Sequence, residues 1–291
     1  FIIPYNLHVI LNIFFADNIV AILLPSIFIL LFSNSKKKYF LISIFLFLLY
    51  LTKNSSMFIV MFLPFLIILL EKDSLLLKSL PLLGCIMAIL IWGLFGTIKT
   101  GKFPFGSSIL TSNTKVLNEV VFNDDFKKIY PKKSVDLLPR SKIPNNIKHE
   151  WEVYEYFKTK NKNYLKNNFN KYLLDIPIKI KFIFFNIRKD SVFPLNGIYE
   201  NPIIISHIIN RAIFNLSIII CSFLLIKNFI KKLNIYNQKN DVYFIGILIS
   251  SLFPNIIGWA TSKHLVGIQI ISAIYLLFKF YDFYKKNTIK I

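Results

Sequence analysis

The charged residues that could do chemistry are few, and they adjoin long apolar runs. Lys53 lies between two apolar segments, Lys263 and His264 lie between two others, and Arg211 lies near the start of a further one. Cationic groups at a membrane surface can bind phosphate. We therefore expect these four residues to contribute to a phosphate or anionic-lipid site. Taken singly, each lysine could instead extend its charge to lipid head groups, and His264 could be an ordinary interfacial histidine.

Carboxylates give a weaker signal. Asp17 begins an apolar segment, where it could cap a helix or line a cavity and orient a substrate. Asp124-Asp125 and His149-Glu150 lack the further ligands of a metal site. The sequence has no nucleophile elbow, Walker loop or dinucleotide fingerprint. No cofactor is therefore predicted, although a divalent metal ion could take part.

Composition indicates which elements must position these residues. The chain has 291 residues, of which 55% are hydrophobic, with a mean hydropathy of +0.55 and a net charge of +20. Soluble domains are usually less apolar, whereas membrane proteins combine apolar spans with basic loops. The two cysteines lie inside apolar runs, which excludes a disulfide framework and zinc-ligand spacing. The composition predicts an all-α integral membrane protein.

Seven apolar segments are candidates for membrane-spanning helices, each of which needs about 20 residues. The second and third segments are short, so they could be tilted, or one could be re-entrant. The seven segments are Asn18–Phe32, Tyr39–Leu51, Met57–Leu70, Leu80–Ile98, Ile204–Ile226, Val242–Ala260 and Leu265–Phe280.

The lysines alternate between the two sides of this arrangement. One set of connections and ends holds 13 lysines, from Lys36 to Lys290, and the opposite short connections hold only Lys53 and Lys263. Because positive charge favours the cytoplasmic side, residues 99–203 are predicted to form a helical loop of about 100 residues on the extracytoplasmic face. The chain then divides into spans at 1–98, this loop, and spans at 204–291. An extracytoplasmic basic loop argues against a nucleic-acid partner.

The long loop has amphipathic character. Ile147, Trp151, Tyr154 and Phe157 recur at helical spacing, and a second stripe follows from Leu165 to Ile176. Helices rich in lysine and aromatic residues tend to lie in the membrane interface. No internal repeat relates the first four spans to the last three, which disfavours a transporter built from inverted repeats.

Five local features occur in an ordered series along the chain. The first two are an acid at the start of a span (Asp17) and a Leu-Thr-Lys turn (Leu51–Ser56). The third is a tryptophan, Trp92, before a Gly-Lys-Phe segment that leaves the membrane (Lys99–Phe103). The last two are an amphipathic helix (Trp151–Tyr164) and a late Ser-Lys-His turn (Ser262–Gly267). In this order the chain resembles the later portion of integral-membrane glycosyltransferases of the GT-C superfamily, which include protein mannosyltransferases and lipid A aminoarabinose transferases. Lysines at 53 and 263 stand where that family has arginines.

The resemblance implies an enzyme that transfers a sugar from a polyprenyl-phosphate donor to a glycan or lipid acceptor on the outer face of a bacterial plasma membrane. Lys53, Lys263, Arg211 and His264 would bind the donor phosphate, and bilayer lipids would surround the spans. The family's catalytic carboxylate lies in an earlier loop, so we expect it upstream of Phe1. Two alternatives remain: an O-antigen polymerase or ligase, and a non-enzymatic transporter or flippase.

Overall fold

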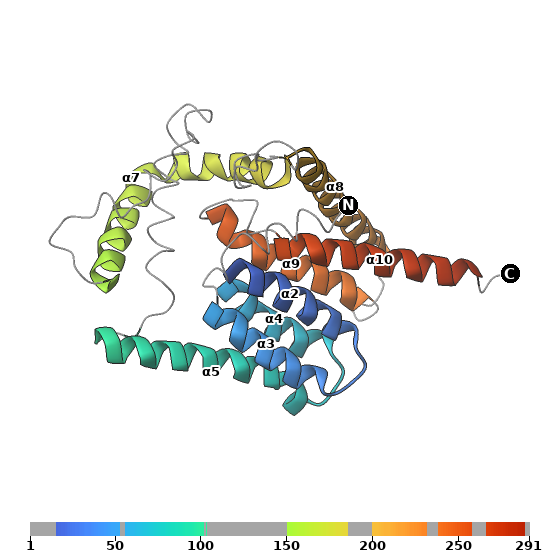
Figure 1. Ribbon diagram of the computed structural model, residues 1–291, viewed down its shortest axis with the longest axis horizontal. Helices are drawn as coiled ribbons and strands as arrows, with labels where there is room; N and C mark the ends of the chain where they lie inside the picture. The colour runs from blue at the N-terminus through green and yellow to red at the C-terminus, as the bar shows by residue number, and fades with distance from the viewer. Residues whose placement is uncertain are drawn as a thin grey trace. The chain divides into compact units, whose positions relative to one another are not determined.

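The computed structural model describes residues 16–52, 56–101, 103, 150–185, 200–231, 238–257 and 266–288, and no strand occurs among them. Eight helices account for nearly all of these residues (Figure 1). They are α2 (Ala16–Phe32), α3 (Lys38–Thr52), α4 (Met57–Leu70), α5 (Leu75–Thr100), α7 (Glu150–Phe185), α8 (Glu200–Ile230), α9 (Lys239–Ile257) and α10 (Val266–Thr288).

The chain forms two compact units. Unit 1 comprises Phe1–Ala88, Ile187–Leu252 and Ser262–Ile291, and unit 2 comprises Ile89–Asn186 and Phe253–Thr261. Helices α5 and α9 therefore contribute to both units.

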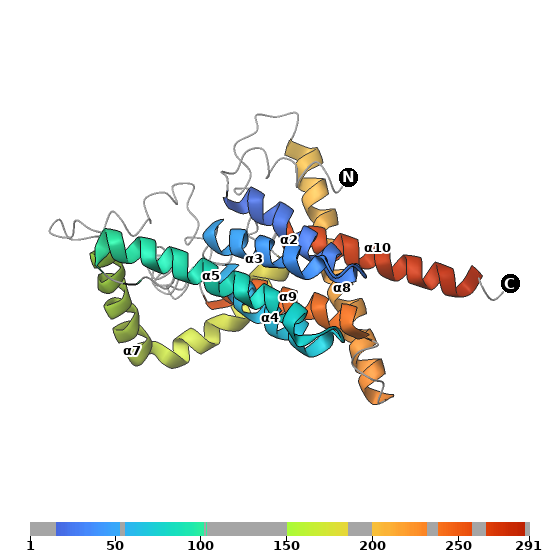
Figure 2. The ribbon, with the colours of Figure 1, turned by 90° about the horizontal axis from the view of Figure 1, so that it is seen from below.

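Helices α2, α3 and α10 lie side by side in unit 1 (Figures 1 and 2). A short connection at residues 33–37 returns the chain from α2 to α3, so these two helices are antiparallel. Near its start, α10 packs against the start of α2, because Gly267 lies close to Val20 and Ala21. Further along, the ring of Phe278 stacks on that of Phe32 at 4.4 Å. Helices α2 and α10 therefore run in the same direction.

Aromatic rings join three helices in the core of unit 1. Phe28 of α2 meets Phe244 of α9 edge-on at 6.3 Å, and Phe244 stacks on Tyr275 of α10 at 4.2 Å. All three side chains are fully buried. Such aromatic pairs stabilise a core beyond the area that they bury.

Polar side chains bond α5 to its neighbours within unit 1. Ser43 Oγ of α3 donates to the carbonyl oxygen of Leu80 at 2.9 Å, and Cys85 Sγ donates to the carbonyl oxygen of Val60 in α4 at 2.9 Å. Hydroxyl and thiol contacts of this kind hold membrane helices together where apolar packing alone gives little preference.

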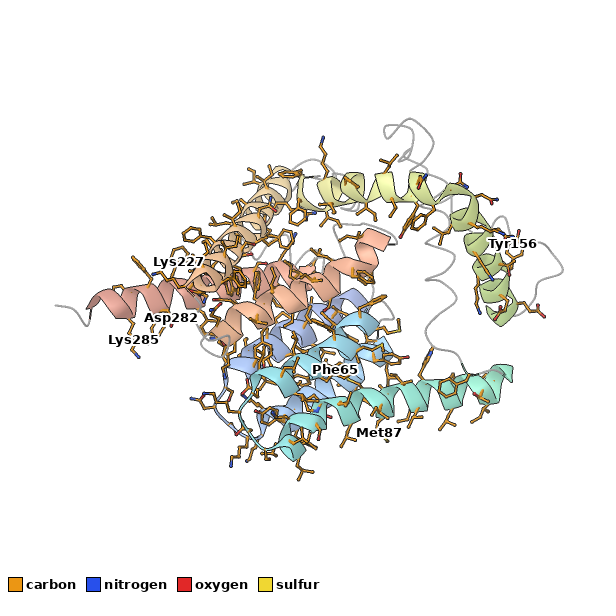
Figure 3. All side chains as sticks on the ribbon, turned by 180° about the vertical axis from the view of Figure 1, so that it is seen from behind. Phe65, Met87, Tyr156, Lys227, Asp282 and Lys285 are labelled. Atoms are coloured by element: carbon orange, nitrogen blue, oxygen red, sulfur yellow. The ribbon has the colours of Figure 1, made fainter. Side chains whose placement is uncertain are left out.

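Within the part of the chain that the structure describes, three helices are long and apolar enough to cross a membrane: Leu75–Lys99, Ile208–Ile230 and Val266–Lys285. Only 17% of the apolar stretch is buried by protein in α5, and the same share in α8. Large apolar side chains such as Phe65 and Met87 are half exposed (Figure 3). Apolar surface of this extent requires lipid or another apolar partner.

Each of the seven predicted apolar segments contains a helix within the described residues. The main difference concerns α5, which begins at Leu75 rather than Leu80. Lys78 therefore lies in the first turn of a helix and not in the loop to which the charge pattern assigned it. Lys78 can lie in this helix because its charge is satisfied by the chain itself. Its ammonium group donates to the carbonyl oxygens of Ile68 and Glu71, at the end of α4, at 2.8 and 3.0 Å.

Unit 2 contains the end of α5 and the whole of α7. Gly101 ends α5 with a positive φ of 70°, and its amide donates to the carbonyl oxygen of Thr97, as in the left-handed glycine that commonly follows a helix. The two predicted apolar stripes of the loop fall largely on α7, which is interrupted at Asn168 by a φ of −133°.

Candidate functional site

The structure describes only part of the site predicted from the sequence. Lys53, Lys263 and His264 lie outside the described residues. Asp17 lies in the first turn of α2, and its side chain is not described. Arg211 is described, and it is only 4% exposed on α8.

The starts of α2 and α10 come together at one end of unit 1. A Cβ atom at position 267 would lie 3.4 Å from the carbonyl oxygen of Val20, which is an ordinary van der Waals contact between the two helices. Asp17 lies one turn before Val20, and α10 begins shortly after Lys263 and His264 in the sequence. Val20 and Gly267, about 250 positions apart in the sequence, thus meet at this helix–helix contact.

Arg211 belongs to a set of buried polar residues that we call the α8–α10 seam. We use this name for Ser206, Asn210 and Arg211 of α8 and Gln269 of α10, a helix that α8 contacts. Ser217 and Ser272 are also buried, but their hydroxyls bond to carbonyl oxygens of their own helices. The guanidinium carbon of Arg211 lies 6.0 Å from the ring centre of Phe214. Buried polar residues in apolar helices that could span a membrane often mark binding sites or pathways.

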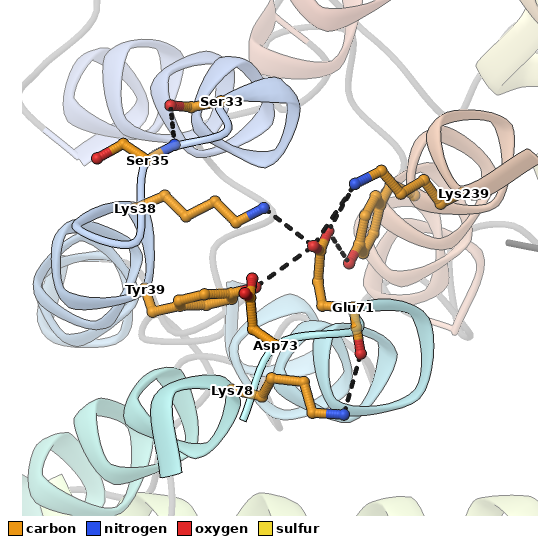
Figure 4. A network of polar contacts seen from close by, with 9 residues as sticks. Ser33, Ser35, Lys38, Tyr39, Glu71, Asp73, Lys78 and Lys239 are labelled. Carbon is orange, nitrogen blue, oxygen red and sulfur yellow. Dashed lines mark hydrogen bonds and ion pairs between the residues drawn. The ribbon is translucent and has the colours of Figure 1, made fainter. Parts of the chain in front are cut away.

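A second polar group, the Glu71 cluster, lies at the opposite end of α3 from Thr52 (Figure 4). Glu71 follows α4 directly, and its carboxylate accepts hydrogen bonds from Lys38 at 3.0 Å, Lys239 at 3.3 Å and the hydroxyl of Tyr243 at 3.1 Å. The hydroxyl of Tyr39 bonds to both Glu71 and Asp73. The six members are Lys38, Tyr39, Glu71, Asp73, Lys239 and Tyr243.

Local structure positions the members of this cluster. Ser33 and Ser35 hold the connection before α3, because their hydroxyls accept hydrogen bonds from the amides of Ser35 and Lys37 at 3.2 and 3.3 Å. Lys38 is then the first residue of α3 and points inward. On the other side, Lys78 bonds the last carbonyl groups of α4 and fixes the backbone at Glu71.

The electrostatics of the Glu71 cluster favour an ionised carboxylate. Burial by itself raises the pKa of Glu71, but hydrogen bonds and charges from Lys38 and then Lys239 outweigh it, so the pKa is lowered. The side chains of Lys38 and Glu71 are only 4% and 5% exposed. A buried carboxylate that accepts several hydrogen bonds from cations stays charged.

A further polar group, the Asp241 cluster, surrounds Asp241 in the first turn of α9. Its other members are Cys221 of α8 and Tyr275 and Lys279 of α10. Lys279 forms an ion pair with Asp241, whose Oδ1 also accepts a hydrogen bond from the Tyr275 hydroxyl at 2.9 Å. Cys221 Sγ donates to the backbone oxygen of Asp241 at 3.5 Å. This cluster joins α8, α9 and α10.

The two clusters were missed by sequence reasoning, which treated Lys38, Lys239 and Lys279 as loop charges. The signal that could have found them is the presence of Glu71 and Asp241 at the ends of apolar runs, since an acid there needs a partner. Both clusters join helices through ion pairs and hydrogen bonds. Among the described residues, no group of three histidine, cysteine or acidic side chains could hold a metal ion.

Comparisons with known proteins found no matching family model, no similar curated protein and no similar solved structure.

Proposed function

We propose that the chain is the later portion of a membrane glycosyltransferase that transfers a sugar from a polyprenyl-phosphate donor to an extracytoplasmic acceptor in cell-envelope glycan assembly. One observation carries the proposal: the starts of α2 and α10 adjoin at Gly267, while Arg211 is buried on α8, which contacts α10. The chain segments that bear Asp17, Lys263, His264 and Arg211 thus belong to one unit.

The chemistry suits these residue types. In the reaction, the bond between the sugar C1 and the phosphate oxygen breaks, a bond from C1 to an acceptor oxygen forms, and the acceptor proton passes to a carboxylate. Lys53, Lys263, Arg211 and His264 would stabilise the phosphate that leaves with the lipid. Asp17 would orient a substrate. The reaction needs no nucleotide.

The proposal includes a topology of seven spans in a bacterial plasma membrane, with residues 99–203 on the extracytoplasmic face. The short apolar helices α3 and α4 would cross as a tilted pair. Cysteines introduced at Lys132 and Trp151 should react with an impermeant thiol reagent added outside intact cells. Labelling of either position only after the cells are lysed would refute this topology.

The activity is tested in the complete reading frame with polyprenyl-phosphate sugars. The double variant Lys53→Ala, Lys263→Ala should lose donor turnover, whereas the matched variant Lys36→Ala, Lys37→Ala removes two exposed lysines elsewhere and should keep it. Near-normal turnover in the first variant would contradict the proposed roles. A polymerase or ligase would instead consume a lipid-linked glycan, and a flippase would move the lipid without breaking the sugar–phosphate bond.

A further inference from the structure

Gln269 carries a buried side-chain amide that lacks a hydrogen-bond partner among the described residues. It is 2% exposed on the first turn of α10, within a stretch that could span a membrane. Neither its oxygen nor its nitrogen has a hydrogen-bond partner in the part of the chain that the structure describes. An amide carries two donors and an acceptor, so its burial without partners costs free energy.

The charged clusters of the same unit differ in this respect. Glu71 and Asp241 accept hydrogen bonds from lysines and tyrosines, and Tyr243 and Tyr275 donate to them. The charged side chains of these two clusters are thus paired with partners inside the fold. A buried group left without a partner calls for a specific explanation, such as a function or an unseen ligand.

The position of Gln269 indicates what the ligand is. The helical period places it about 200° around α10 from Gly267, which contacts α2. Gln269 is thus buried on a face of α10 turned away from α2, and α8 is a further neighbour of this helix. A neutral amide in the α8–α10 seam, on helices that could span a membrane, suits a neutral group with several hydroxyls.

We propose that Gln269 binds hydroxyl groups of the sugar carried by the lipid-linked donor, in the α8–α10 seam. This inference rests on the proposed function, and it assigns the sugar to Gln269 and the phosphate to the cations. Gln269 is accordingly a specificity residue and takes no part in bond breaking.

The test measures binding to the purified full chain with two probes: a short-chain prenyl-phosphate sugar, in hexosyl and pentosyl forms, and the same prenyl phosphate without sugar. The variant Gln269→Leu should weaken binding of the sugar-bearing probe about tenfold and leave the bare phosphate probe unchanged. Its melting temperature without ligand should be equal to or above that of the wild type, because an unpaired amide is removed.

Ser272→Ala is the matched control. Ser272 lies one turn later on α10 and is also buried, but its hydroxyl donates to the carbonyl oxygen of Ile268 at 2.9 Å. This variant should bind both probes as the wild type does.

The outcomes separate the inference from the proposed function. If the wild type binds both probes and Gln269→Leu binds them equally well, the inference is overturned and the proposed function stands. Equal weakening of both probes, or a lower melting temperature without ligand, also overturns the inference. If the wild type binds neither probe, both proposals fail.

Discussion

The carboxylate of Glu71 lies 3.3 Å from the ammonium group of Lys239, although 168 positions separate the two residues in the sequence. The same carboxylate holds Lys38 at 3.0 Å. One acid thus ties the start of α3, the end of α4 and the start of α9. Because Glu71 carries a single negative charge between two lysines, it is the member whose loss would leave most charge uncompensated.

Replacement of Glu71 should destabilise the protein strongly. The variant Glu71→Ala leaves the buried Lys38 without its acid, and breaking a buried ion pair in this way costs about 3–5 kcal/mol. We expect a clearly lower melting temperature in detergent micelles. Lys36→Ala, at an exposed lysine two positions before Lys38, serves as the control and should melt like the wild type. An unchanged melting temperature for Glu71→Ala would mean that the cluster does not clamp the helices.

The contrast between Lys36 and Lys38 shows which features of the structure could be predicted from the sequence and which could not. Apolar runs predicted where helices occur, because a helix satisfies its own backbone whatever surrounds it. The fate of each lysine could not be predicted in the same way. Lys36 is exposed and Lys38 is 4% exposed, and the difference depends on an acid that only the three-dimensional arrangement brings near. Arg211 was a candidate from the sequence because it is a cation near the start of an apolar segment, whereas Gln269 carries no charge and gave no signal.

Acid should weaken the same clamp. The pKa of Glu71 is lowered in the folded protein, from a usual value of about 4.3, by Lys38 and Lys239 against the effect of burial. The unfolded chain therefore binds this proton more readily, and the stabilisation is complete above about pH 5 and is lost as the pH falls through the folded pKa. Melting temperatures measured from pH 7 to pH 3 should fall at the acid end, and less steeply for Glu71→Gln. Parallel curves for the two proteins would contradict this assignment.

Asp241 and Lys279 should prove energetically coupled. Their ion pair joins α9 to α10, and the Tyr275 hydroxyl also bonds to Asp241. Asp241→Asn and Lys279→Met should each destabilise the protein, and the double variant should lose less than the sum, with a coupling of about 1 kcal/mol or more. Unfolding in detergent measures all four proteins of the cycle. Strict additivity would show that the pair contributes nothing beyond its separate residues.

The apolar stripe of α7 should contact the membrane interface. Phe169, Leu173 and Ile180 are 56%, 44% and 37% exposed, and the helical period places them within about 40° of one another. The helix carries seven lysines and four acids, so its surface complements anionic lipid. In the sequence, α7 lies between α5 and α8, two helices that are long and apolar enough to span a membrane, so we expect α7 to lie near the bilayer.

A fluorophore attached at single positions can test this contact in the full chain, reconstituted with anionic lipid. Labels at Phe169, Leu173 and Ile180 should be quenched by brominated lipid more than labels at Asn170 and Lys181, each of which follows a stripe residue and is turned from it by about 100°. Replacing Phe169 and Leu173 with aspartate should then remove the quenching at Ile180. Equal quenching at stripe and control positions, or none at either, would show that α7 does not lie on the membrane with this face.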